Sequence, residues 1–288
     1  MTDFPLVVSP AALAAWIDYP SDDLSLVIVD CRFSLAEPHL GERQYLDSHI
    51  PGAHYLHLDR DLSGSVRTHG GRHPLPPVAE LAKTLGKMGI TSKTQVVVYD
   101  DSRFAFAARL WWLLRYLGHD RVSVLDGGFR AYQGAGYPVT SLVPPRQAGC
   151  FEPQVRPQIV IDIQGVLARL EDPEVVLMDA REAERYRGER EPIDPVAGHI
   201  PGAVNVCWQQ MTDDQGWMQP NPIDLGASWA DAREIVVYCG SGVTACVNLL
   251  GLAASGLQTG VLYGGSWSDW CSYPLDAQGI AQVPSEHA

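Results

Sequence analysis

The chain has 288 residues, of which 46% are hydrophobic and 19% are charged, and this composition excludes a disordered protein. Its formal net charge of −13 argues against nucleic acid or an anionic membrane surface as the principal partner. The length is sufficient for two ordinary domains.

The cysteines and the N-terminal residues indicate the cellular compartment and the kinds of site to expect. Six cysteines occur, but they form neither a Cys-x-x-Cys pair nor a Cys/His cluster, so we expect no metal site and no disulfide framework. The segment 1–5 lacks a basic region followed by an apolar one, and no apolar run is long enough to span a membrane. We therefore expect a cytoplasmic protein with no membrane partner, where a reactive thiol stays reduced.

Short apolar strands alternate with helical stretches along the chain, a pattern that indicates an α/β fold with a mainly parallel sheet flanked by helices. In the first half the expected strands are 26–30, 95–99 and 122–125, and the expected helices are 77–86 and 105–117. A stretch rich in Pro and Gly follows. We predict two domains, residues 1–140 and 158–288, joined by a linker at 141–157.

The second half repeats motifs of the first half in the same order, which indicates a duplicated domain. His-Ile-Pro-Gly-Ala occurs at 49–53 and again at 199–203, and Val-Val-Tyr-Asp at 97–100 corresponds to Val-Val-Tyr-Cys at 236–239. His49 and His199 belong to the motif in both halves, including the half without a thiol at the strand end. We therefore interpret both histidines as structural.

Cys239 is the strongest candidate for a nucleophile. It follows the apolar strand 235–238 and precedes a helix expected over 243–254. Gly240 and Gly242 permit a tight turn whose amides point inward beside a helix N-terminus, and such surroundings favour an anion. For a cysteine that anion is its own thiolate, the reactive form. The alternative is a small buried apolar residue, and that is our reading of Cys246, inside the helix.

The corresponding loop in the first half reads Asp-Asp-Ser-Arg-Phe at 100–104, so a carboxylate replaces the thiol and the loop glycines are absent. We expect this half to contribute stability and one wall of a cleft between domains, where ligand pockets are common. We also expect that Asp100→Cys creates no second active site, because the glycines are missing.

The chain resembles the tandem-domain rhodanese-like sulfurtransferases, which include thiosulfate and 3-mercaptopyruvate sulfurtransferases. The resemblance covers nearly the whole chain and rests on both His-Ile-Pro-Gly-Ala segments, Asp-Gly-Gly at 126–128, Gly-Gly-Ser-Trp at 264–267 and the Cys239 loop. It implies two rhodanese-like domains, the second catalytic, with a persulfide on Cys239 and no cofactor or metal. The implied partners are a small anionic sulfur donor and, as acceptor, cyanide, a small thiol or a reduced protein thiol.

The sequence Cys-Gly-Ser-Gly-Val-Thr at 239–244 is similar to that of mercaptopyruvate enzymes, whereas thiosulfate enzymes tend to have basic residues after the cysteine. The resemblance therefore implies 3-mercaptopyruvate as donor, with thiosulfate as the alternative. It makes the loop substrate-binding, through Gly240, Gly242, Val243 and Thr244.

The resemblance also implies substrate-binding arginines, since arginine offers a bidentate fork to a carboxylate. Arg185 matches the family's first such residue. Arg190 lies near the position of the second but is not aligned with it, which favours the thiosulfate alternative.

A Ser-His-Asp proton relay has been proposed for mercaptopyruvate enzymes, and the matching residues here are Ser241, His73 and Asp59. His73 lies in a stretch rich in Gly and Pro, where an ordinary loop histidine is the alternative.

Two other functions are alternatives to a sulfurtransferase. A cysteine phosphatase needs an arginine six residues after the cysteine, but Ala245 stands there. A persulfide carrier module would pass its sulfur only to a partner protein.

Overall fold

The computed structural model describes residues 4–19, 24–145, 149–220, 222, 229 and 232–284. The chain forms two compact units. The first unit consists of residues 1–64, 76–156 and 212–220, and the second of residues 65–75, 157–211 and 221–288. Each unit thus includes a short segment from the other half of the sequence, which the predicted division did not contain. Residues 146–148 of the predicted linker lie outside the described residues.

The first unit contains a five-stranded sheet in which all strands are parallel, in the order β1-β5-β4-β2-β3. The strands are β1 (Val7–Val8), β2 (Leu26–Asp30), β3 (Ala53–Tyr55), β4 (Gln95–Tyr99) and β5 (Val122–Leu125). The three strands expected in this half have the predicted bounds. Parallel pairing places their carboxyl ends at one edge of the sheet, where polar loop residues follow.

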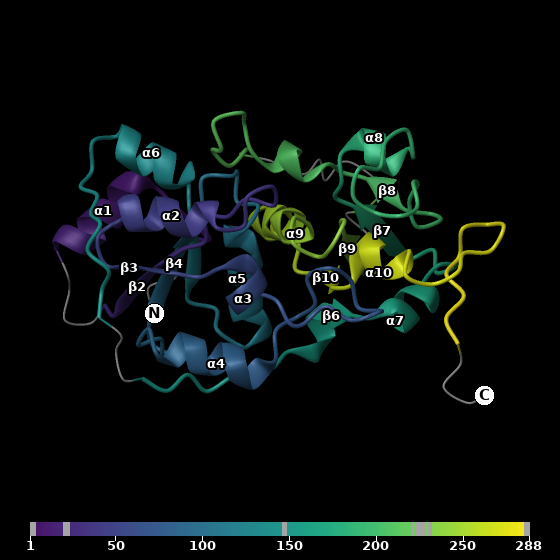
Figure 1. Ribbon diagram of the computed structural model, residues 1–288, viewed down its shortest axis with the longest axis horizontal. Coiled ribbons are helices and arrows are strands. Elements are labelled where there is room, and N and C mark those ends of the chain that lie inside the picture. Colours follow the sequence, from purple (N-terminus) through teal and green to yellow (C-terminus); the bar gives the residue numbers. More distant parts are fainter. Residues whose placement is uncertain are drawn as a thin grey trace. The chain divides into compact units, whose positions relative to one another are not determined.

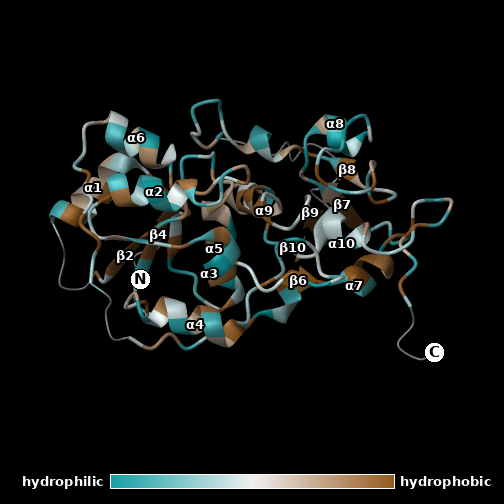
Figure 2. Ribbon diagram, viewed as in Figure 1, coloured by the Kyte–Doolittle hydropathy of each residue, from teal (hydrophilic) through white to brown (hydrophobic). Residues whose placement is uncertain are grey.

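Helices cover both faces of this sheet, with α1, α2 and α6 on one side and α4 and α5 on the other (Figure 1). Burial of both faces explains the nearly continuous apolar character of β2 and β4, brown in Figure 2. The helices are α1 (Pro10–Asp18), α2 (Leu40–Asp47), α3 (Leu58–Asp61), α4 (Val78–Gly86), α5 (Ala107–Tyr116) and α6 (Gly128–Gly134).

The second unit repeats this topology with a parallel sheet in the order β6-β10-β9-β7-β8. Its strands are β6 (Val160–Ile161), β7 (Val175–Asp179), β8 (Val204–Asn205), β9 (Glu234–Tyr238) and β10 (Gly260–Tyr263). Its helices are α7 (Ile163–Leu167), α8 (Ala183–Tyr186), α9 (Ala245–Ala254) and α10 (Ser266–Trp270), with 3-10 turns η1 (Pro157–Ile159) and η2 (Trp208–Met211). The predicted α/β fold, two parallel-sheet domains flanked by helices, is confirmed.

Each of the repeated histidines packs against the helix that precedes it, α2 in the first unit and α8 in the second. His49 stacks on Tyr45 with ring centroids 4.0 Å apart, and His199 stacks on Tyr186 at the same distance. The Nδ1 atom of each histidine also hydrogen bonds to the carbonyl oxygen of its tyrosine, at 2.6 and 2.7 Å respectively. These contacts agree with the structural role expected for both histidines.

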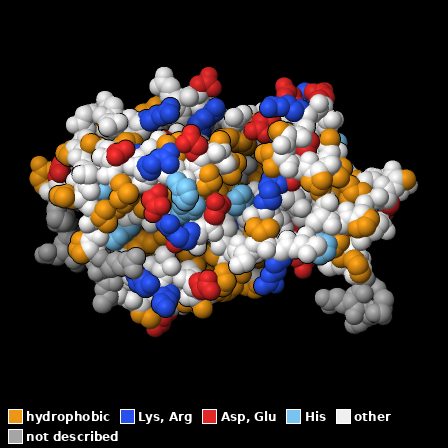
Figure 3. Space-filling model, viewed as in Figure 1, with side chains coloured by type: hydrophobic (Ala, Val, Ile, Leu, Met, Phe, Trp, Pro, Cys, Tyr) orange, Lys and Arg blue, Asp and Glu red, His pale blue; other side chains and the backbone are white. Residues whose placement is uncertain are grey.

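Acidic and basic side chains are interspersed on the face that Figure 3 shows, so the net charge of −13 is not gathered there into one acidic field. Within the described ranges, no helix is both long and apolar enough to traverse a bilayer.

Candidate active site

Cys239 lies directly after β9, and its backbone is anchored on both sides. Its N–H donates to Ser266 Oγ at 3.1 Å, and its carbonyl oxygen accepts from the Trp267 N–H at 3.0 Å. Its side chain lies in a sheltered position, with only 2% of the residue exposed. A nucleophile held in this way keeps one orientation at the end of the strand.

Ser266 adopts a strained backbone conformation in order to provide that anchor. Its φ is +57°, a region that residues other than glycine rarely occupy. In the first unit Gly128, with φ +61°, stands at the same place, since Phe129 there donates to the Asp100 carbonyl as Trp267 does to Cys239. The serine thus accepts a conformational cost that glycine avoids, and its hydroxyl provides the acceptor for the Cys239 N–H.

Gly242 brings an amide to the sulfur of Cys239. Its N–H donates to Sγ at 3.2 Å, and its φ is +76°. A Cβ atom at this position would lie only 2.4 Å from the carbonyl oxygen of Gly264. Both the backbone conformation and the space therefore require glycine, and the amide contact supports the anion-stabilising turn expected from the sequence.

The rest of the loop leads into α9. The carbonyl of Gly240 accepts from the Ser268 N–H at 2.9 Å, and Thr244 occupies the N-cap position of α9. The Val243 side chain is buried. Cys246 is completely buried inside the helix and donates to the Gly242 carbonyl at 3.4 Å, which agrees with its expected place in the core.

Ser241 and His73 are in contact, although 168 positions separate them in the sequence. Nδ1 of His73 lies 2.7 Å from Ser241 Oγ, and both side chains are buried. The segment 65–75 that carries His73 belongs to the second unit, like the Cys239 loop. Two members of the predicted relay are therefore neighbours.

Asp59, the third predicted member, lies on α3 in the first unit. Its N–H donates to Nδ1 of His57 at 3.2 Å, within the first turn of the helix. Its part in the relay stays a prediction.

Arg185, on α8, faces the Cys239 loop and is fixed by two carboxylates. Its Nη2 donates to Glu191 at 2.8 Å and to Asp194 at 3.0 Å. Burial acts to raise the pKa of Glu191, but the hydrogen bond from Arg185 and two backbone amides outweigh it, so this pKa is lowered. For Asp194 burial prevails over the charges of Arg72 and Arg185, and its pKa is raised.

Arg190 lies on the surface, with 69% of its side chain exposed, and it is 3.9 Å from the exposed carboxylate of Glu184. A different arginine, Arg72, was not among the predicted site residues, and its guanidinium lies near Gly240 and is ion-paired with Asp194. The signal available in the sequence was its position directly before His73, a residue already assigned to the site.

The first unit contains an amide array of its own, filled by the Asp100 carboxylate. This carboxylate accepts hydrogen bonds from four backbone N–H groups, with N···O distances of 2.8 to 3.1 Å. The array forms without glycine, since Arg103 and Phe104 themselves adopt φ of 59° and 69°. Our sequence-based reason for this loop's inactivity, the lack of glycines, is therefore wrong. The array exists, but a fixed carboxylate occupies it.

Two other described thiols are kept in their neutral form by their surroundings. Burial raises the pKa of Cys271 to about 12 and raises that of Cys31 well above its usual range. Neither thiol is therefore suited to nucleophilic attack near neutral pH.

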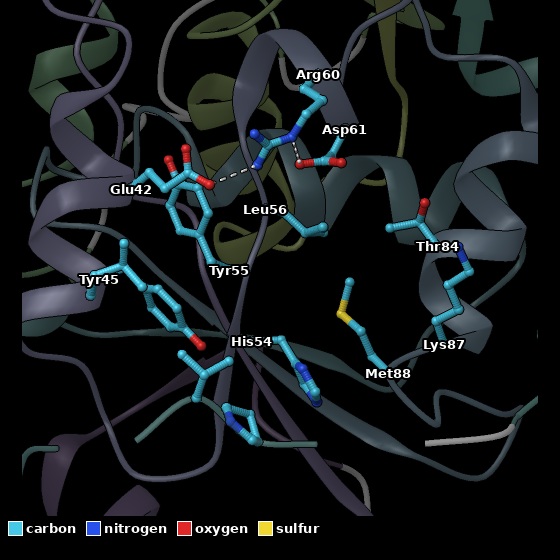
Figure 4. Close-up of a pocket in the computed structure, with 13 residues that line it drawn as sticks. Glu42, Tyr45, His54, Tyr55, Leu56, Arg60, Asp61, Thr84, Lys87 and Met88 are labelled. Carbon is cyan, nitrogen blue, oxygen red and sulfur yellow. Dashed lines mark hydrogen bonds and ion pairs between the residues drawn. The ribbon is translucent and has the colours of Figure 1, made fainter. Parts of the chain in front are cut away.

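A surface pocket of about 610 Å³ lies in the first unit between α2, β3, α3 and α4 (Figure 4). In it the Arg60 guanidinium lies between the carboxylates of Glu42 and Asp61, at 3.3 Å from each. Burial lowers the pKa of His54, another lining residue. The lining contains none of the predicted site residues, and we assign this pocket no part in chemistry at Cys239.

Comparisons with known proteins show the family to which this chain is similar. The rhodanese-like domain model matches residues 10–135 and 162–273. A Pseudomonas aeruginosa protein named "Probable 3-mercaptopyruvate sulfurtransferase" is 45% identical over 270 residues, which cover 91% of this chain and 93% of that protein. A Mycobacterium tuberculosis relative with the provisional name thiosulfate sulfurtransferase is 39% identical over 282 residues, covering 93% and 95%.

A solved structure extends the agreement to three dimensions. The crystal structure of SseA from Escherichia coli, a 3-mercaptopyruvate sulfotransferase, superposes with a TM-score of 0.77 at 31% identity. The match covers 92% of this chain and 100% of that one. With two matched domains, the duplicated parallel sheets and the cysteine loop at the end of β9, this chain belongs to the rhodanese-like family.

Proposed function

We propose that this protein is a sulfurtransferase that takes sulfur from 3-mercaptopyruvate and passes it to cyanide or a thiol through a persulfide on Cys239. The observation that carries the proposal is the Cys239 sulfur held 3.2 Å from the Gly242 amide, beside the hydrogen-bonded pair Ser241 and His73. An amide near the sulfur suits a thiolate and also the terminal sulfur of a persulfide.

In the first half-reaction the Cys239 thiolate attacks the donor sulfur, and the new S–S bond forms as the C–S bond of mercaptopyruvate breaks. The electron pair of that C–S bond passes to the C3 carbon, which leaves as the enolate of pyruvate. The proton that the donor thiol carried ends on that carbon. The products are pyruvate and an ionised persulfide on Cys239, so atoms and charge balance.

In the second half-reaction an acceptor nucleophile attacks the outer sulfur of the persulfide. Cyanide yields thiocyanate, and a thiolate yields a new persulfide once a proton is taken up. The S–S bond breaks and its electron pair returns to Cys239, which is regenerated as the thiolate. The alternation of a donor and an acceptor at one sulfur predicts ping-pong kinetics.

The pair Ser241 and His73 suits the proton transfer in the first half-reaction, because a mercaptopyruvate thiol has a proton to lose whereas thiosulfate has none. We expect Ser241→Ala to lower kcat with mercaptopyruvate by about 100-fold, the usual scale of general acid–base catalysis. With thiosulfate the same variant should lose less than about 5-fold, since a lost relay matters only where a proton moves. Equal losses with both donors would contradict the relay.

The donor itself is tested by steady-state sulfur transfer to cyanide with each donor at matched concentrations. We expect kcat/KM for 3-mercaptopyruvate to exceed that for thiosulfate by more than about 10-fold, because Cys-Gly-Ser-Gly-Val-Thr is similar to the loop of mercaptopyruvate enzymes and lacks the basic residues that tend to follow the cysteine in thiosulfate enzymes. A preference for thiosulfate would overturn the donor assignment and leave the Cys239 persulfide intact. No turnover with either small donor or acceptor would favour the carrier module.

A further inference from the structure

The segment 65–75 is fixed to α10 through its own backbone. The Gly70 N–H donates to the buried Asp269 carboxylate at 2.7 Å, and the Arg72 N–H donates to Ser268 Oγ at 3.1 Å. Both acceptors are side chains of α10, and both lie in the second unit with the segment. The segment itself, all of which the structure describes, contains no helix or strand. Its position is therefore set by these contacts.

Gly71, between the two anchored amides, lets the segment lie directly on the start of α10. Its φ is +83°, and a Cβ there would lie only 2.4 Å from the Gly265 carbonyl oxygen. The same carbonyl accepts from the Ser268 hydroxyl at 3.2 Å. The Ser268 hydroxyl thus donates its proton on one side and accepts the Arg72 N–H on the other, so that it cannot rotate without losing both bonds.

Ser268 also contacts the loop that follows β9. Its N–H donates to the Gly240 carbonyl at 2.9 Å. Gly240 directly precedes Ser241, and Arg72 directly precedes His73. One residue of α10 therefore holds the backbone next to each member of the pair Ser241 and His73, whose Oγ and Nδ1 atoms are 2.7 Å apart.

The helix that carries Ser268 is itself firmly packed. The two tryptophans of α10 are buried, Trp267 at 2% and Trp270 at 0% exposed. Their indole N–H groups donate to the carbonyl oxygens of Val196 at 2.9 Å and of Gly279 at 3.1 Å. Large buried side chains with satisfied polar groups keep an element in one place, so α10 offers both backbones a fixed reference.

We propose that Ser268 is a positioning residue that sets the distance between Ser241 and His73 by joining the two backbones that carry them. The inference rests on the proposed function, in which this pair moves the proton of the donor thiol. Proton transfer between side chains requires hydrogen-bond distance, and a displacement of about 1 Å can cost up to about 100-fold in rate. Ser268 acts on the reaction only through the pair that it aligns.

The test compares Ser268→Ala with the control Ser272→Ala. Ser268→Ala removes the acceptor of the Arg72 N–H and keeps the backbone N–H that holds Gly240. Ser272 also contacts the segment, since its Oγ lies 2.7 Å from Nδ1 of His69, but this contact is at the far end from the pair. We expect Ser268→Ala to lower kcat with mercaptopyruvate about 10-fold and Ser272→Ala to lower it less than about 2-fold.

A double-mutant cycle with Ser241→Ala separates positioning from a general loss of structure. In the Ser241→Ala background the pair no longer exists, so Ser268→Ala should lower kcat by less than about 2-fold more. An effect through stability, or through the Arg72 side chain, would persist in both backgrounds. The inference is wrong if Ser268→Ala matches Ser272→Ala, or if it lowers kcat equally with and without the Ser241 hydroxyl.

A measurement without any sulfur donor keeps this inference distinct from the proposed function. Diethyl pyrocarbonate acylates imidazole, and mass spectrometry of peptides locates the modified histidine. His73 is only 9% exposed, and we expect its acylation to be at least about 5-fold faster in Ser268→Ala, through local opening of the segment, and unchanged in Ser272→Ala. An unchanged rate in Ser268→Ala would overturn the positioning role. Equal losses with both donors in Ser241→Ala, together with faster acylation in Ser268→Ala, would overturn the proton relay and leave Ser268 as the residue that places His73.

Discussion

Replacing Cys239 with serine is expected to reduce sulfur transfer by at least about 1,000-fold, because a hydroxyl cannot form the persulfide on which both half-reactions depend. The fold should persist, since serine is close in size and the Gly242 N–H that now contacts Sγ can donate to the new oxygen. We expect the free energy of unfolding to change by less than about 1.5 kcal/mol. Steady-state transfer to cyanide and a denaturant titration measure the two effects.

Cys246→Ser is the matched control for that variant. Cys246 is also buried and lies in the helix after the loop, where its Sγ donates to the Gly242 carbonyl at 3.4 Å, a bond that a serine hydroxyl can also make. This control should keep its activity and its cyanide-releasable sulfur, whereas Cys239→Ser should carry none. Labile sulfur on Cys239→Ser, or its loss from Cys246→Ser, would indicate that the persulfide forms on another thiol.

Asp100→Ala is expected to produce the largest loss of stability, although it lies in the half without a nucleophile. The Asp100 carboxylate accepts from the backbone N–H groups of Ser102, Phe104, Phe106 and Ala107, and Asp100 is 1% exposed. Burial raises its pKa even though these hydrogen bonds act to lower it. Removal of the carboxylate leaves several buried donors without an acceptor, and we expect the free energy of unfolding to fall by about 3–5 kcal/mol.

Asp101→Ala provides the comparison, since Asp101 is only partly buried and its carboxylate accepts from the Ser102 hydroxyl at 3.3 Å. Its effect should stay below about 1 kcal/mol in the same denaturant titration. Equal losses for the two variants would mean that the amide array around Asp100 contributes nothing specific to stability.

Asp100→Cys is still expected to gain no donor-dependent sulfur, but the reason differs from the one drawn from the sequence. The first unit has the amide array, but it lacks an arginine at the position that corresponds to Arg185. Tyr45 and Tyr186 occupy matching places, since each stacks on its repeat histidine, and the residue before Tyr186 is Arg185 whereas the residue before Tyr45 is Gln44.

Strand periodicity was enough to predict the sheets. The strands 26–30, 95–99 and 122–125 have the expected bounds because each is a buried apolar run bordered by polar residues. The edge strands β1 and β8 have two residues each, which are too few to form a recognisable sequence pattern. Two predicted helices began too early, at 105 and 243, because Ala105, Phe106 and Val243 are apolar and buried without being helical.

The candidate site was predictable as far as it lies near a motif. Cys239, Gly242 and Ser241 follow a strand and precede a helix, which is a local signal. The position of Arg72 beside the loop depends on an ion pair with Asp194, 122 positions away, and on Gly240, which leaves space for the guanidinium. Neither relation has a local signature, and Arg190 was named only because it lies near the position where the resemblance implies a second arginine.

The exchange of short segments between the two units has a consequence for the order in which the protein matures on the ribosome. Residues 212–220 belong to the first unit although they are synthesised late. Residues 65–75 belong to the second unit although they are synthesised early. Domains commonly fold one after another as the chain emerges. Here the first unit cannot acquire its last segment until about half of the second has been synthesised, so the first unit is not complete before the second has begun to emerge. A fragment that starts at residue 157 would therefore lack Arg72 and His73, which belong to the second unit, so the second half of the sequence is not a complete unit without the first.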